Sequence, residues 1–126
     1  MDTDNRMNSS YKVEEIGQVQ IADEVIAVIA GLASTEVDGV IQMSGNITNE
    51  IVSMLGMKNL SRGVKVDING EEVEVKLSLV LRYGISIPET SREVQEKVKN
   101  AIETMTGLTV TNVHIRIAGI QTAEEE

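Results

Sequence analysis

The sequence predicts an α+β domain, a two-layer sandwich in which helices cover mainly one face of a mixed β-sheet. Three features of residues 64–120 predict it. Two alternating apolar runs meet at Asn69-Gly70, a helical pattern begins near Pro88 and ends before Gly107, and a last alternating run follows. Asn-Gly between alternating runs is the strongest local signal for an antiparallel hairpin. The strand–helix–strand order after it requires two parallel strands joined by a right-handed crossover.

The first half of the domain is predicted to alternate strands and helices. Residues 18–21 form a short strand, and residues 22–33 form a helix with two acids in its first turn, where carboxylates favour the helix dipole. A second strand is expected at 40–43, and a short helix at 47–55 with Asn46 as its N-cap. The helix at 22–33 is apolar over more than one face. It is therefore either a well-buried core helix or a helix that also meets a partner subunit.

The second half contains the clearest strand pattern. Residues 64–69 alternate, and in residues 73–83 one side is apolar as far as Tyr83 while the other is mostly polar, which is typical of a half-buried antiparallel strand. The next helix begins either with Pro88 at its first position or with the capping box Thr90–Glu93, and its apolar stripe runs to Met105. A final strand is expected at 110–118, which completes the order β-α-β-α-β-β-α-β. The predicted core includes Val25, Ile29, Leu77, Leu79, Leu81, Val98, Ile102, Ile115 and Ile117.

The length of 126 residues fits one domain with one core. Because only 2% of the residues are aromatic, that core must be aliphatic. We expect a disordered lead at residues 1–11, the folded domain at 12–120, and an acidic, solvated tail at 121–126.

Composition excludes several functional classes. The net charge of -9 opposes binding to nucleic acid, and the aromatic platforms that stack single strands are missing. The absence of cysteine excludes disulfides, thiol nucleophiles and thiolate metal sites. The polar N-terminus has no signal-peptide pattern, and the longest apolar run, residues 25–33, is roughly half of a membrane span. We therefore expect a cytoplasmic protein without direct membrane insertion.

No residues with a catalytic, cofactor-binding or metal-binding pattern are predicted. His114, the only histidine, shares the polar side of the last strand with Arg116, and a lone histidine there is far more often a surface residue than a catalyst. The acids Asp67, Glu71, Glu72 and Glu74 could attract a divalent cation weakly, but their spacing matches no EF-hand loop. No glycine-rich phosphate loop is present.

Two features leave room for a partner. The outer sheet face is expected to display Lys65, Asp67, Glu72, Glu74, Lys76, Val80, Arg82, His114 and Arg116. Methionines cluster around the short helix at Met43, Met54 and Met57, and methionine surfaces adapt to partners. The alternatives are a plain hydrated sheet face and methionines that fill a core lacking Phe and Trp. The candidate partner surface comprises Met54, Met57, Lys76, Val80, Arg82, His114 and Arg116.

The sequence also resembles a known family. The runs IADEVIAVIAGLASTEVDGV, RGVKVDI, LRYGISIPETSREVQEKVKNAIETMTGLTV and NVHIRIAGI, over roughly residues 17–120, are similar to the alkaline shock protein family, also called Gls-type general stress or envelope stress response proteins. The resemblance implies a small, acidic, non-enzymatic bacterial protein without a cofactor. Some members of the family self-assemble, and some are attached to the inner face of the membrane through a separate anchor protein, so the resemblance implies that this chain can do the same.

Three functional hypotheses follow. The first is a non-enzymatic interaction protein of envelope stress or homeostasis that associates with itself. The alternative is a small-ligand-binding or regulatory module that acts on an envelope or lipid-synthesis enzyme. The third is a hydrolase, which requires two carboxylates facing one cleft with perturbed pKa values.

Overall fold

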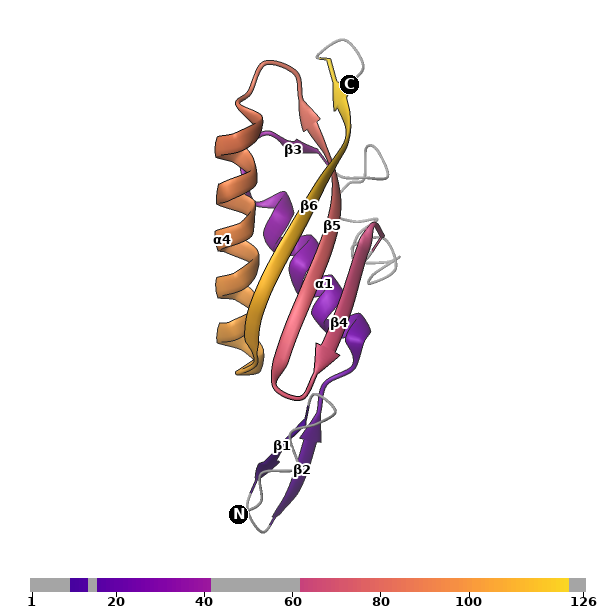
Figure 1. The fold of residues 1–126 in the computed structure, drawn as a ribbon, viewed down its shortest axis with the longest axis vertical. Helices are drawn as coiled ribbons and strands as arrows, with labels where there is room; N and C mark the ends of the chain where they lie inside the picture. The colour runs from indigo at the N-terminus through magenta and orange to yellow at the C-terminus, as the bar shows by residue number, and fades with distance from the viewer. Residues whose placement is uncertain (1–9, 14–15, 42–61, 123–126) are drawn as a thin grey trace.

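The computed structural model describes residues 10–13, 16–41 and 62–122 (Figure 1). Its elements, in chain order, are β1 (Ser10–Val13), β2 (Gly17–Gln20), α1 (Asp23–Thr35), β3 (Val40–Ile41), β4 (Val64–Asn69), β5 (Glu72–Arg82), α4 (Ile87–Thr106) and β6 (Thr109–Gln121). The predicted α+β class is confirmed. The expected helix at 47–55 and the methionines Met43, Met54 and Met57 lie outside the described residues.

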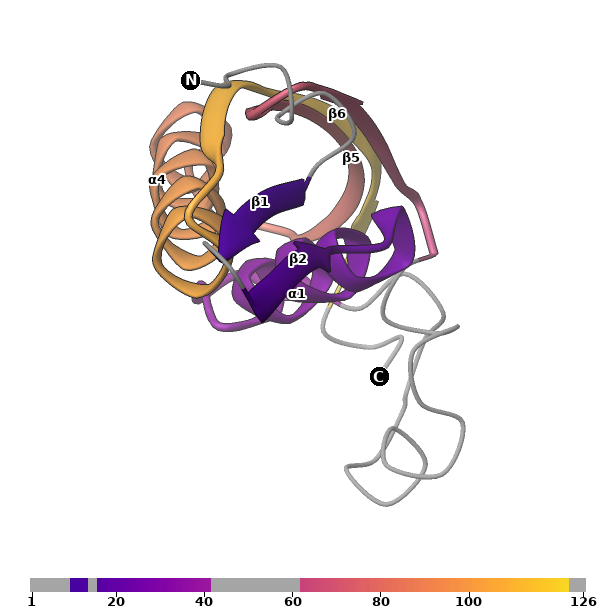
Figure 2. The same ribbon diagram turned by 90° about the horizontal axis from the view of Figure 1, so that it is seen from below.

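The central strand of the main sheet is β5. Along one edge it pairs in parallel with β6, as the predicted crossover requires, and along the other it pairs antiparallel with β4 and then with β3. The predicted hairpin between β4 and β5 is present, although its two-residue loop is Gly70-Glu71, one residue later than expected. Gly70 has φ +68°, which explains why glycine stands there. Figure 2 shows the sheet curving around α1 and α4, which both lie on its inner face.

The strand expected at 18–21 is present as β2, but it stands apart from the main sheet. It pairs antiparallel with β1 in a separate hairpin that lies beyond the end of the sandwich (Figure 1). All four residues of β2 are exposed. Because β2 has no buried face, packing against the core does not stabilise it in the main sheet. It pairs instead with β1, the strand that precedes it in the chain. The first strand, β1, already begins at Ser10.

One aliphatic core lies between the sheet and the two helices. Six of the nine predicted core residues are buried, and Ile115 and Ile117 pack against the core in a half-buried state because β6 is an edge strand. The largest fully buried side chains are Ile26, Val73, Val75, Leu81, Val94, Val98 and Ile102.

The prediction that Val25 belongs to the core is wrong. Val25 is 40% exposed and Leu32 is 45% exposed, seven residues apart on one side of α1. The opposite side of this helix, which carries Ile26 and Ile29, packs into the core. Tyr83 and Met105 also lie outside, because the chain turns away after β5 and the buried side of α4 continues from Ile102 to Thr106, which leaves Met105 facing solvent.

The start and end of α4 follow local rules. Ser86 is the N-cap, and its hydroxyl accepts a hydrogen bond from the Glu89 N–H at 3.3 Å. Pro88 lies in the first turn, so the helix begins before the competing start at Thr90. Gly107 ends the helix in the left-handed conformation, with φ +79°.

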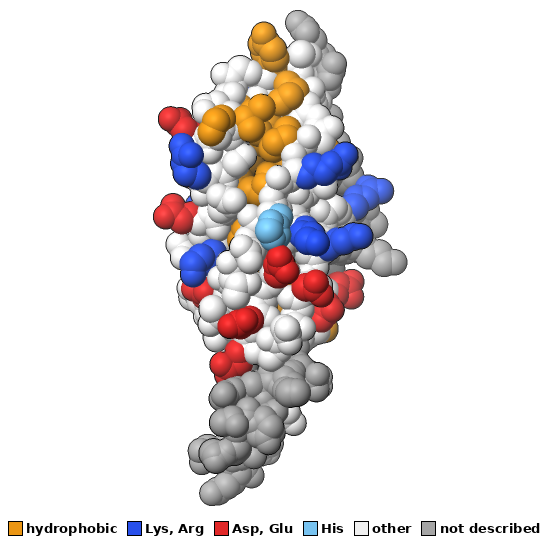
Figure 3. Space-filling model, viewed as in Figure 1, with side chains coloured by type: hydrophobic (Ala, Val, Ile, Leu, Met, Phe, Trp, Pro, Cys, Tyr) orange, Lys and Arg blue, Asp and Glu red, His pale blue; other side chains and the backbone are white. Residues whose placement is uncertain are grey.

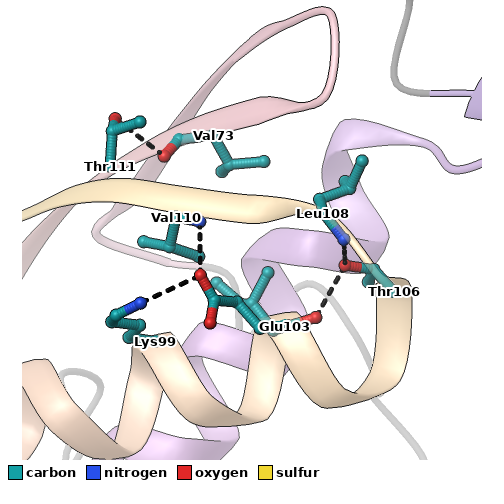
Figure 4. Close-up of polar contacts among 8 residues, drawn as sticks. Val73, Lys99, Glu103, Thr106, Leu108, Val110 and Thr111 are labelled. Carbon is teal, nitrogen blue, oxygen red and sulfur yellow. Dashed lines mark hydrogen bonds and ion pairs between the residues drawn. The ribbon is translucent and has the colours of Figure 1, made fainter. Parts of the chain in front are cut away.

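A polar network fastens the start of β6 to the last turn of α4 (Figure 4). Glu103 Oε2 accepts hydrogen bonds from the Val110 N–H at 2.9 Å and from Lys99 Nζ at 3.0 Å. These donors, the Val110 N–H first, lower the pKa of the Glu103 carboxyl, although burial acts in the opposite direction. The Thr106 hydroxyl accepts a hydrogen bond from the Leu108 N–H at 3.1 Å. The network therefore holds the first residues of β6 against the C-terminal part of α4, at the point where the chain enters the sheet.

The lowered pKa of Glu103 predicts a dependence of stability on pH. Because the pKa is lower in the folded chain than in the unfolded one, the ionised carboxyl stabilises the fold above the ordinary pKa of glutamate. That contribution is lost as the pH falls through the folded pKa. We expect E103Q to lower the free energy of unfolding by about 1 kcal/mol near pH 7. Urea unfolding between about pH 3 and 7 should show a shallower pH dependence in E103Q. The exposed E93Q on the same helix is the control, and equal slopes in all three proteins would contradict the role assigned to Glu103.

Candidate functional site

The outer face of the sheet, opposite α1 and α4, is open. Along β5, buried residues alternate with half-buried or exposed ones, and no helix within the described part of the chain covers the second set. Figure 3 shows this face as a mixed surface of charged and apolar side chains.

Charged residues on this face are sorted into rows that run across the strands. Asp67 of β4 lies opposite Glu74 of β5, and in the next row Lys65 lies opposite Lys76, which lies opposite His114 of β6. Figure 3 shows an acidic region next to a basic one. Like charges directly opposite one another destabilise a sheet, so the stability of the sheet does not explain why these charges are arranged in rows of one sign.

Beyond the row of Ser78 and Arg116, the outward positions along β5 and β6 are no longer charged as far as Val80 and Gly119. Val80 lies opposite Ile41 of β3 on one side and Gly119 of β6 on the other, where a bulge adds Ala118 to β6. Exposed apolar side chains from three segments lie at this same end of the molecule (Figure 3). We call this region the apolar end, and it comprises Val80 with Tyr83, Ile87 and Ile120, which are 70%, 42% and 44% exposed.

His114 has a partner that sequence reasoning missed. Its Nε2 lies 2.7 Å from Glu74 Oε2, and both side chains remain partly open to water. The partner could not be predicted from spacing because it lies diagonally across the parallel pairing of β5 with β6. The pair lies on the open sheet face, and among the described residues no third polar group contacts it to position the histidine as a general base.

Carboxylates do gather at one place on the outer face. Asp67, Glu72 and Glu74 line a shallow hollow of about 280 Å³ with Thr111. Asp67 and Glu72 are exposed, and one oxygen of Glu74 contacts His114. The hydrolase hypothesis asks for two acids that face one cleft, and a shallow hollow with two exposed acids gives it no support. Within the described ranges, no three His or acidic residues are arranged to hold a metal ion.

The outer edge of β6 is partly protected by α4. Glu103 accepts from the Val110 N–H, and Gln95 Nε2 donates to the Val113 carbonyl at 3.0 Å. Since alternate residues of a strand direct their backbone groups to opposite edges, Ile115 and Ile117 face the same free edge as Val113. No hydrogen bond from the rest of the described chain reaches the free edge at these two residues. Within the described chain, the edge of β6 is therefore open at Ile115 and Ile117, beside the apolar end.

The structure brings together five residues of the candidate partner surface. Lys76, Val80, Arg82, His114 and Arg116 all lie on β5 and β6. Arg82 lies at the margin, where its guanidinium is 3.5 Å from Asp38. Met54 and Met57 lie outside the described residues, so their part in this surface stays a prediction. Sequence reasoning missed Ile87, Ile120 and the free edge of β6, because only the pairing of the strands shows which edge is open.

The fold and this surface define a class of protein, a small α+β domain whose described part has an open sheet face. A family model described as "Asp23 family, cell envelope-related function" matches residues 11–122. The chain belongs to the Asp23 family, and the resemblance to alkaline shock and Gls-type proteins is confirmed.

Relatives from two bacterial genera show the same likeness. The chain is 37% identical over 121 residues to the uncharacterized protein YqhY of Bacillus subtilis, covering 96% of this chain and 90% of that protein. It is 35% identical over 107 residues to YloU of the same organism, covering 83% and 89%. It is 29% identical over 113 residues to a stress response regulator gls24 homolog of Streptococcus pyogenes, covering 86% of this chain and 62% of that protein.

No solved structure matches this chain. Neither helix in the described residues is long and apolar enough to span a membrane.

Proposed function

We propose that this protein is a non-enzymatic interaction protein of the cell-envelope stress response, which associates with itself through the free edge of β6. The family description and the stress-response name of one relative support the cellular role. The observation that carries the self-association is the open edge at Ile115 and Ile117, which lies beside the apolar end.

The edge has the properties of a pairing strand. An exposed edge presents a row of backbone donors and acceptors, and soluble proteins usually block such edges with proline, inward-pointing charges or a covering element. In β6 the side chains on the core side are Val113, Ile115 and Ile117, and no proline interrupts the strand. The covering groups from α4 reach only as far as Val113. The edge beyond this point lacks these protections.

A second copy of the chain fits this edge best. Two β6 strands can pair antiparallel about a two-fold axis, so that one patch serves both copies and the assembly closes. Such pairing satisfies the free backbone groups of both copies and brings the two exposed Ile120 side chains into the interface. A net charge of -9 opposes association, so we expect the interaction to strengthen with salt.

Self-association can be tested with a matched pair of variants. Ile120 is 44% exposed at the apolar end and Leu32 is 45% exposed on α1. Replacement by lysine therefore removes a similar amount of exposed apolar surface at each site. We expect the wild-type chain and L32K to form dimers by size-exclusion chromatography with light scattering, and I120K to shift at least tenfold toward the monomer. A strictly monomeric wild type would contradict the proposal. Loss of dimers in L32K alone would assign the interface to α1 instead.

We further propose that the protein acts in the cytoplasm and reaches the membrane through a separate anchor protein. The family description relates it to the envelope, while no helix in the described part of the chain could insert. Fractionation of native cells with and without detergent tests this location. Recovery only in the soluble fraction, with no cross-linked membrane protein, would contradict it.

A further inference from the structure

A hollow on the outer face lies where the three long strands meet. It has a volume of about 380 Å³ and is lined by Gly63, Lys65, Lys76, Ser78, His114 and Arg116, together with adjoining residues of the same strands. Gly63 and Ser78 are the smallest residues of this lining, and the Ser78 N–H donates to the Gly63 carbonyl at 2.9 Å. Long basic side chains therefore surround a floor of small residues.

The cations around this hollow have no carboxylate directly opposite them on the neighbouring strand. Lys65 and Lys76 lie opposite one another on neighbouring strands, and Arg116 lies opposite Ser78 in the next row. Elsewhere, Lys97 pairs with Glu36 and Lys99 pairs with Glu103. Among the described residues, by contrast, no carboxylate forms an ion pair with Lys65, Lys76 or Arg116. The chain as a whole is acidic, and opposed like charges lower the stability of the sheet. We therefore take the three cations at this hollow as an indication of an anionic ligand.

We propose that this hollow binds the phosphate group of a small phosphorylated compound. The Arg116 guanidinium can donate two parallel hydrogen bonds to phosphate, the two lysines supply positive charge, and the Ser78 hydroxyl can donate from the floor. The size of the ligand is limited by the adjacent acidic row of Asp67 and Glu74, which would repel an extended polyanion that crosses both rows. A single phosphate group fits the basic row alone. This site does not depend on the proposed self-association.

The experiment compares variants that change the charge equally. K65Q/K76Q removes two cations from the hollow, and R92Q/K97Q removes two from α4, where Arg92 lies at a different groove and Lys97 pairs with Glu36. Inorganic phosphate and glycerol 3-phosphate are titrated by calorimetry at low ionic strength, where electrostatic binding is strongest. Vesicles of phosphatidylglycerol, with phosphatidylcholine as control, test whether the phosphate belongs to a lipid headgroup.

We expect K65Q/K76Q to weaken phosphate binding at least tenfold and R92Q/K97Q to change it less than twofold. Binding of the soluble phosphates identifies a metabolite site, and binding of phosphatidylglycerol vesicles alone identifies a headgroup site. Without ligand, K65Q/K76Q should melt about 2 °C higher than the wild type, because two opposed like charges are removed. Absence of binding to all three phosphate probes, or an equal loss in both variants, would overturn the proposal.

Discussion

Replacing Leu81 by alanine is expected to lower the free energy of unfolding by about 2–5 kcal/mol. Leu81 is fully buried on the inner face of β5, where β3 and β6 both pair with the central strand. Truncation to alanine removes buried apolar surface and leaves a cavity that neighbouring aliphatic side chains can fill only in part. Urea unfolding followed by circular dichroism measures the change as a lower midpoint at an unchanged slope.

The control for this substitution is the next residue along the strand. Val80 points to the outer face, so V80A should cost less than about 1 kcal/mol, chiefly through its lower strand propensity. The comparison tests the two-layer architecture directly because both substitutions lie on the same strand. If V80A is as destabilising as L81A, an element covers the outer face, and the open sheet surface does not exist.

Replacing Ile102 by alanine is the second large expected effect, again about 2–5 kcal/mol. Ile102 is fully buried on the stripe of α4 that also carries Val94 and Val98, and this stripe packs against the sheet and α1. Isoleucine to alanine keeps or improves helix propensity, so any loss of stability comes from packing. Thermal and urea unfolding of the variant should both show the loss.

Met105 provides the matched position on the same helix. It is 68% exposed, so M105A should change the free energy of unfolding by less than about 0.5 kcal/mol. Equal effects of I102A and M105A would mean that α4 is rotated relative to the structure, with Met105 in the core.

Much of the fold could be predicted because local patterns and packing agree. The alternation in β5, the hairpin before it, and the apolar stripe and glycine end of α4 each have a local cause that the core then reinforces. Val25 and Met105 were misplaced for a different reason. A helical stripe shows which side is apolar, but which apolar residues are covered depends on the width of the neighbouring elements.

The candidate site was less predictable from the sequence. Alternation alone assigns the residues of a strand to one face of a sheet. The sequence therefore predicts that Lys76 and Arg82 of β5, and His114 and Arg116 of β6, lie on the polar outer face. The contact of His114 with Glu74 and the opposition of Lys65 to Lys76 depend on strand register. The open edge of β6 depends on the order of strands in the sheet. These are relations between distant segments, which a local pattern does not contain.

The proposal that two β6 strands join copies of this protein is tested most directly by hydrogen exchange of the Ile115 and Ile117 amides at several protein concentrations. If the edge pairs between copies, these two amides exchange rapidly in dilute solution and become protected as dimers form, while amides that already bond to β5 do not change. Exchange at Ile115 and Ile117 that stays fast at concentrations where light scattering detects dimers would contradict the proposal.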